Sequence, residues 1–323
     1  MEYIKIKIVS VYKWGLAFFS KKDIMPKFNE KINTENNGFE IRVYDIDSSN
    51  QDDVNKLENY IISKVKKMKI HNGISTYSNV SGIKKDFLNK IKEAEDNNKS
   101  ELSKICTPEE NKKKWFDVRR SRVTEFMSQL LLEKELNCVF FEETDKRINL
   151  SAFEADTHVK GVDVTGIHTD SNGSSKFVIC EVKASGSNDI PCSSSCELLK
   201  DIKNSYNLTN ERVFREIKDF TLKLIEANPS NDISNIIEYI TDLYAQILDK
   251  KSSKNLILDN ILFIPFLIRR NPKIIENNDI GDFNNFNKDD FEQINLKGVM
   301  WVLNQDIDTF CIDLYNKAVP NEQ

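Results

Sequence analysis

The sequence predicts an α/β protein with a mixed sheet, and three observations support this fold class. From residue 107 onward, the hydrophobic pattern predicts the order helix, strand, strand, strand, helix, further helices, strand, strand. Asn172-Gly173 separates two apolar runs, which is a strong signal for a hairpin. The 323 residues are 39% hydrophobic and 30% charged, as in globular proteins with a sizeable core. We expect a small α+β unit with a helical connector over residues 1–105, and the α/β domain over 106–323.

The first unit has short elements and no residue pattern that indicates catalysis. Residues 3–20 and 39–44 alternate in hydrophobicity and predict strands. Apolar residues recur at helical spacing from Val54 to Met68, with lysines on the opposite face. Residues 84–103 are highly charged, which is typical of a connecting arm.

The elements of the second unit each have a local signal. Thr107-Pro108-Glu109-Glu110 is a capping box with proline at the first helical position, and it predicts a helix to about Glu135. Pro265 lacks a ladder N–H, so its strand is expected at an edge or with a bulge. The remaining predictions are strands at 137–141, 161–168, 176–183, 261–268 and 299–303, and helices at 194–206, 210–227, 233–248 and 308–318.

Charge and composition exclude some classes of function. The formal net charge of −5 argues against a protein that coats nucleic acid, although residues 1–100 carry 18 basic against 14 acidic residues. No apolar run approaches the roughly 20 residues of a membrane span, so we expect a cytoplasmic protein without membrane contact. Six scattered cysteines, two of them in apolar runs, favour reduced thiols.

The predicted hairpin brings acidic residues together. If its two strands pair around Asn172, Asp163 lies directly opposite Glu181, and cross-strand neighbours are about 4.5–5.5 Å apart at Cβ. Two carboxylates at that distance repel unless a cation lies between them, and Mg²⁺ or Mn²⁺ is the expected occupant. The backbone carbonyl of Val182 could be a further ligand. Lys183 lies two residues along on the same face as Glu181 and could stabilise charge on a phosphodiester under attack by water.

Asp163 followed by Glu181-Val182-Lys183 resembles the PD-(D/E)XK nuclease superfamily. The resemblance implies a restriction-endonuclease-like α-β-β-β-α-β core, covers residues 107–206 and extends loosely to about 270. It also implies that a glutamate of the first helix, here Glu125, completes the metal shell. Gly161-Val162 precedes the acid where the family often has a proline, and no clear Gln-x-x-x-Tyr follows in the next helix. The late strand and closing helix are similar to the small nuclease-like subunit of Hachiman-type anti-phage systems, which implies a helicase partner.

Other candidate residues have two interpretations each. Arg119, Arg120, Arg122 and Lys160 could bind the phosphate backbone, but arginines along a helix are more often solvated or paired with acids. Glu125 lies roughly opposite the main apolar stripe of its helix, so it qualifies as a ligand only if that helix is buried on two sides.

The function predicted from the sequence is Mg²⁺- or Mn²⁺-dependent cleavage of nucleic acid, DNA rather than RNA, in a bacterial defence or DNA-processing complex. The alternative is a catalytically silent nuclease-like scaffold that binds nucleic acid or a helicase. An ordinary surface salt bridge between Glu181 and Lys183 is also compatible with the pattern.

Overall fold

A computed structural model describes residues 24–36, 39–70, 113–148, 161–186, 192–206, 212–227, 233–249, 254–270 and 294–318, with single positions at 86, 89, 90 and 93. The predicted strand at 3–20, the arm at 84–103 (apart from those single positions), the capping box at 107–110 and Lys160 lie outside these residues. The helices and strands, in chain order, are β1 (Asn29–Asn36), β2 (Phe39–Asp45), α2 (Gln51–Ile70), α5 (Lys113–Glu135), β3 (Cys138–Val139), the 3₁₀ turn η2 (Glu142–Thr144), β4 (Val164–Thr169), β5 (Ser175–Ser185), α6 (Cys192–Tyr206), α7 (Arg212–Glu226), α8 (Ser234–Leu248), α9 (Lys254–Asp259), β6 (Ile261–Arg269), β7 (Asn295–Val302) and α10 (Ile307–Ala318).

The predicted α/β class with a mixed sheet is confirmed. The described strands form one seven-stranded sheet in the order β1-β2-β7-β6-β5-β4-β3. The four central strands β2, β7, β6 and β5 run parallel, and β1, β4 and β3 join them in antiparallel pairs. The strands of residues 24–70 therefore belong to the same sheet as those of residues 113–318, across the boundary expected near residue 105.

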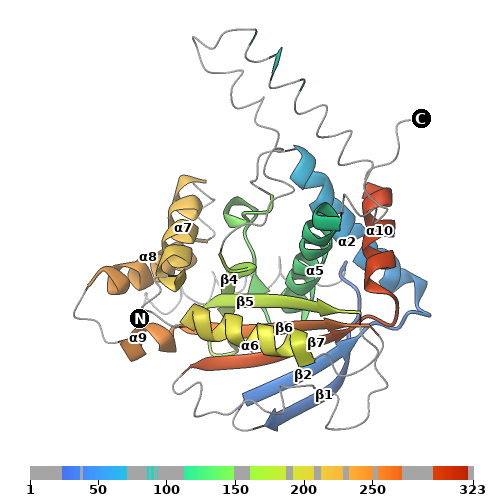
Figure 1. Cartoon of the computed structure of the whole chain (residues 1–323). Coiled ribbons are helices and arrows are strands. Elements are labelled where there is room, and N and C mark those ends of the chain that lie inside the picture. The colour runs from blue at the N-terminus through green and yellow to red at the C-terminus, as the bar shows by residue number, and fades with distance from the viewer. Residues whose placement is uncertain are drawn as a thin grey trace.

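Helices cover both faces of the sheet, as Figure 1 shows. Apolar side chains of α2, α5 and α10 pack on one face, and those of α6, α7, α8 and α9 pack on the other. Strand β5 alternates between these two cores: Val178, Cys180 and Val182 contribute to the first, and Phe177 and Ile179 to the second. Because both faces are covered, β5 and β6 are apolar on both sides.

Helix α5 is buried all round rather than along one stripe. Every side chain from Arg122 to Glu133 is buried, including the charged and polar ones. It lies between the sheet and the helices α2 and α10. The condition set for Glu125, burial on two sides of its helix, is therefore met.

One strand prediction is wrong in its position. Pro265 does not place β6 at an edge, because β6 is an interior strand paired with β5 and β7. The pairing of β6 with β7 skips Ile264 and Pro265 but keeps the same register on both sides, so there is no bulge and the ladder is interrupted only locally. The strand β1 and the short helix α9 had no prediction, since their residues show neither clear alternation nor a cap signal.

Two further expectations concern the environment of the chain. In the part of the chain that the structure describes, no helix has both the length and the apolar character that a bilayer crossing requires. Cys138, Cys180 and Cys311 are buried free thiols, as expected for cysteines inside apolar elements.

Candidate active site

The hairpin that organises the site has the predicted register. Val164 pairs with Cys180 and Thr169 with Ser175, so the ladder is centred on Asn172, and its next position would pair Asp163 with Glu181. The Asp170 carboxylate closes the turn by accepting backbone N–H groups from Asn172 (2.9 Å) and Ser174 (2.8 Å). The observed strands differ from the prediction at their ends: β4 begins only at Val164, and β5 continues to Ser185.

Glu181 and Lys183 share the face of β5 that is covered by α6, as the alternation of side chains predicts. The Ser205 hydroxyl donates to Glu181 Oε1 at 2.8 Å, and Arg212 Nη2 lies 2.9 Å from the same oxygen. Lys183 Nζ lies 2.9 Å from an Asp201 carboxylate oxygen. Among the described residues, both side-chain contacts of Glu181 are made to Oε1.

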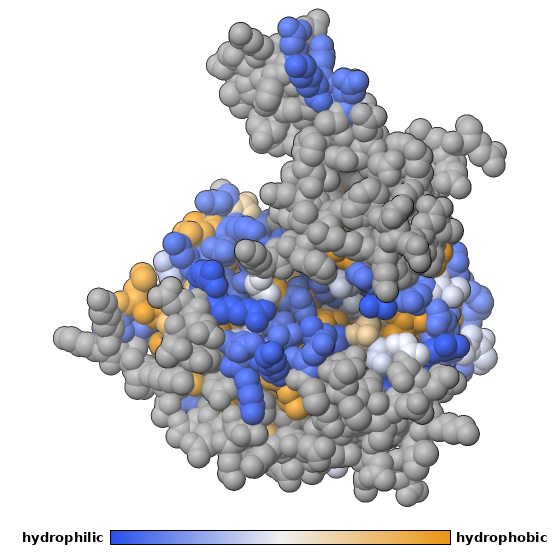
Figure 2. Space-filling model, viewed as in Figure 1, coloured by the Kyte–Doolittle hydropathy of each residue, from blue (hydrophilic) through white to orange (hydrophobic). Residues whose placement is uncertain are grey.

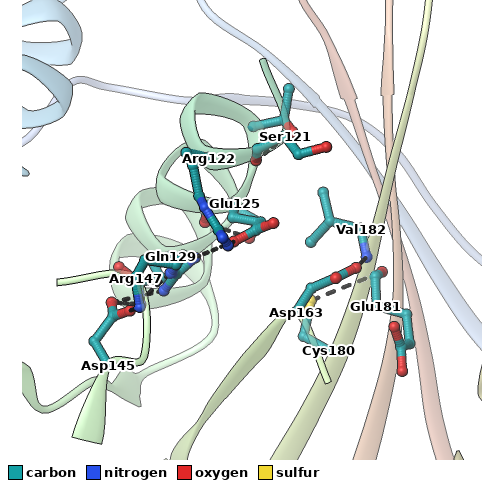
Figure 3. A network of polar contacts seen from close by, with 12 residues as sticks. Ser121, Arg122, Glu125, Gln129, Asp145, Arg147, Asp163, Cys180, Glu181 and Val182 are labelled. Atoms are coloured by element: carbon teal, nitrogen blue, oxygen red, sulfur yellow. Dashed lines mark hydrogen bonds and ion pairs between the residues drawn. The ribbon is translucent and has the colours of Figure 1, made fainter. Parts of the chain in front are cut away.

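Asp163 lies one residue before β4 and turns toward the backbone of β5 rather than toward the Glu181 carboxylate. Its Oδ2 accepts the Val182 N–H at 2.7 Å. The N–H and C=O of one strand residue point to the same side of the strand, so the Val182 carbonyl also faces the side of Asp163. In Figure 3, Asp163 lies between Glu125 and Glu181. The acids predicted from the sequence are therefore neighbours, but their carboxylates do not directly face one another.

Glu125 reaches the site from α5 and is held there by arginines. Its Oε2 lies 3.3 Å from Arg147 Nη1 and 3.5 Å from Arg122 Nη1. Arg147 in turn makes a two-pronged contact with the Asp145 carboxylate, with distances of 2.7 Å from Nε and from Nη2. Figure 3 shows this network running along α5 on the side of Asp163. The arginines compensate the buried charge of Glu125 and fix its orientation.

A charged cleft of about 500 Å³ collects side chains from these separate elements. Glu125 lines it from α5, Asp163 and Val182 from the hairpin, and Lys183 from the end of β5. Glu181 is not part of its wall; it lies buried behind the wall, with 2% of its surface exposed. Hydrophilic side chains gather across the middle of the face in Figure 2, the region that α6 crosses in Figure 1.

The acids of the site are buried, and burial raises the pKa of each. Burial, followed by repulsion from Asp163, raises the pKa of Glu181 to about 8. Burial raises the pKa of Glu125 to about 7 despite the opposing effect of Arg147 and Arg122. Burial also raises the pKa of Asp163, although the Val182 N–H and the Lys183 charge oppose it. Three neighbouring carboxyl groups thus resist ionisation together, and a bound cation would relieve this.

The environment of Lys183, in contrast to that of the acids, favours its charged form. Burial alone would lower the pKa of its ammonium, but the hydrogen bond and charge of Asp201, with the charges of Asp163 and Glu197, raise it above the ordinary value. Lys183 is therefore a fixed positive charge at the wall of the cleft.

The donor set fits a hard divalent cation only in part. Within the described ranges, no three acidic, histidine or cysteine side chains converge closely enough to hold a metal ion together. What is present is the Asp163 carboxylate at the cleft, the Val182 carbonyl on the same side, the Glu125 carboxylate that lines the cleft from α5, and the Glu181 carboxylate behind the wall. Mg²⁺ commonly takes one or two carboxylates and keeps several waters, so this set suits it without a complete protein cage.

The three arginines expected at a phosphate-binding face have different positions. Arg119 and Arg122 are buried, with 2% and 4% of their surfaces exposed. Arg120 is partly exposed and lies 3.1 Å from Asp308 of α10. Arg120 and Arg122 line the cleft, whereas Arg119 does not. They do not form one exposed basic face, because α5 is enclosed by other helices.

Sequence reasoning missed the residues that hold the loop before β4. Gly161 has φ 136°, and a Cβ there would collide with the Glu216 carboxylate of α7. Glu216 in turn lies 2.8 Å from Lys146 Nζ, and Arg212 donates to the Gly161 carbonyl. The first turns of α7 therefore clamp the backbone two residues before Asp163. In the sequence, the only signal for this contact with α7 was Gly161-Val162, which precedes Asp163 where a proline is common.

Compared with known proteins, the chain matches no family model, no curated protein and no solved structure. The chemistry inferred for this site therefore rests on its own geometry.

Proposed function

We propose that the protein is a Mg²⁺- or Mn²⁺-dependent nuclease that hydrolyses phosphodiester bonds of DNA. The observation that carries the proposal is the convergence of Glu125, Asp163 and Lys183 on one cleft from three separate elements, with Glu181 behind Asp163. The chain order α5, β3, β4, β5, α6 and, after the three helices α7, α8 and α9, β6 is similar to the α-β-β-β-α-β order of the PD-(D/E)XK superfamily and supports the proposal. A cluster of buried acids beside a fixed lysine has no advantage for folding, which favours a role in catalysis.

Each residue has a distinct role in this proposal. Asp163 and Glu181, with the Val182 carbonyl, would hold the cation, and Glu125 would assist them from α5. When bound, the cation would supply Lewis acidity at the phosphate and would make a nearby water more acidic. Lys183 would place its ammonium against the negative charge that grows on the phosphate oxygens. Water adds to phosphorus and gives up a proton to solvent, while the P–O ester bond breaks and the leaving oxygen is protonated.

The size and charge of the cleft suit a nucleic acid backbone. About 500 Å³ is in the range of pockets that hold a small ligand such as a nucleotide. Arg120 and Lys183 are partly exposed on its wall and could contact phosphates on either side of the bond that is cleaved. Delivery of the DNA by a helicase or by another subunit of a defence complex is a second proposal, separate from the cleavage reaction.

The test is a cleavage assay on labelled single- and double-stranded DNA and RNA, with Mg²⁺, Mn²⁺ or EDTA. We expect cleavage of DNA that requires metal, and a loss of about 100-fold or more in Lys183→Ala and Glu181→Ala. Lys218→Ala and Glu238→Ala, at exposed positions of α7 and α8, are the matched controls. Unchanged cleavage in both site variants, or cleavage that persists in EDTA, would refute the proposal.

A catalytically silent scaffold that binds nucleic acid is the second candidate. It is favoured by the contacts that Ser205 and Arg212 make to Glu181, and by the absence of a three-ligand group within the described residues. Salt-sensitive binding of DNA without nicking at any Mg²⁺ or Mn²⁺ concentration would select this function instead.

A further inference from the structure

Two polar residues of α6 match two residues of β5 in spacing. Along β5, Glu181 and Lys183 are two residues apart on one face, about 6.8 Å. Along α6, Asp201 and Ser205 are four residues apart on one face, about 6.0 Å. The later helix residue contacts the earlier strand residue: Ser205 pairs with Glu181, and Asp201 pairs with Lys183. The helix therefore runs antiparallel to the strand, with its polar pair aligned to the strand's polar pair.

Among the described residues of this helix face, Glu197 lies one turn before Asp201, with its carboxylate 4.0 Å from Lys183 Nζ, and the neighbouring stripe is apolar. Leu198 and Ile202 belong to the core on this side of the sheet, at positions that follow the same helical stripe. Ser205 continues the stripe and is completely buried, where an apolar residue would be expected. A buried hydroxyl in place of an apolar side chain costs free energy unless it has a partner, and its partner is Glu181.

We propose that Asp201 and Ser205 are positioning residues: Asp201 fixes the ammonium of Lys183, and Ser205 fixes the carboxylate of Glu181. This inference rests on the proposed function, because it assigns the two residues to the lysine and the ligand of that site. It predicts different consequences for each. Asp201 acts on the group that stabilises the transition state, so it affects kcat. Ser205 orients a metal ligand, so it affects the affinity for the cation.

The experiment measures both consequences in the full chain. We expect Asp201→Asn to lower kcat by about tenfold or more at saturating metal, while KM for DNA and the Mn²⁺ affinity change by less than about twofold. We expect Ser205→Ala to weaken Mn²⁺ binding by about tenfold in isothermal titration calorimetry with MnCl₂ and no DNA. Asp219→Asn, at an exposed position of α7, is the matched control and should behave like the wild type. Circular dichroism confirms that the variants are folded.

The outcomes separate the inference from the proposed function. If the wild type cleaves DNA but Asp201→Asn retains its kcat, or Ser205→Ala binds Mn²⁺ as the wild type does, the positioning roles are wrong and the nuclease function stands. A purely structural role would lower the melting temperature without separating kcat from KM. A wild type that neither binds Mn²⁺ nor cleaves any nucleic acid refutes the nuclease function, and the positioning roles with it.

Discussion

Replacing Glu181 by glutamine should stabilise the metal-free protein while it removes the proposed activity. The folded protein holds the Glu181 carboxyl at a pKa of about 8, against an ordinary value of 4.5. Because the folded-state pKa is raised, ionisation of this group opposes folding. The cost is absent below about pH 4.5, grows as the pH rises toward 8, and is constant above that.

The size of this effect follows from the pKa difference. Each pH unit between the two values corresponds to about 1.4 kcal/mol, so at pH 7 the ionisation penalty is about 3 kcal/mol. At pH 7 a carboxyl with this pKa is mostly protonated in the folded protein, so the neutral glutamine amide replaces it closely and can still accept the Ser205 hydroxyl. We therefore expect Glu181→Gln to raise the free energy of unfolding by about 1–3 kcal/mol at pH 7.

The assay is urea unfolding of wild type and variant in EDTA at pH 5, 6, 7 and 8, with Glu238→Gln as the exposed control on α8. The gain should increase with pH for Glu181→Gln and stay near zero for the control. Saturating Mg²⁺ should stabilise the wild type more than the variant. A variant that is less stable than the wild type, or a difference independent of pH, would refute this account of the buried acids.

Three further predictions concern stability. Gly161→Ala should lower the free energy of unfolding by about 2–4 kcal/mol, because of the positive φ and the collision with Glu216, and Gly173→Ala, at φ 82° with open space, should lower it by about 1 kcal/mol. Chemical denaturation measures both losses, and equal losses would contradict the clamp by α7. Burial lowers the pKa of His168 below 6.5, so the stability contributed by its neutral form is complete above that pH and decreases as the pH falls. His168→Asn should therefore reduce the loss of stability between pH 7 and 5. An unchanged pH profile of stability would exclude this contribution. Arg147→Met should lower the free energy of unfolding by about 3–5 kcal/mol in urea, because it leaves the buried carboxylates of Glu125 and Asp145 uncompensated. A loss below about 1 kcal/mol would show that these ion pairs are not needed for stability.

Local patterns were enough to predict much of the chain. Alternation and the Asn172-Gly173 turn predicted the hairpin and its register, because turn conformation and side-chain period are properties of neighbouring residues. Helical periodicity predicted the ends of α5, α6, α7, α8 and α10 within about two residues where they can be compared. Pro265 was misjudged because local chemistry gives the loss of a hydrogen bond but not the position of the strand in the sheet.

The hairpin, its register and the face that Glu181 and Lys183 share follow from neighbouring residues alone. The directions of the Glu181 and Lys183 side chains depend on the packing of distant elements. The packing of α6 and α7 on this face brings Asp201, Ser205 and Arg212 to them. The enclosure of α5 on all sides turns Glu125 into a buried acid facing Asp163. These contacts join residues that are distant in the chain, and the pKa shifts arise from burial. Both depend on how the layers pack, which no local pattern encodes.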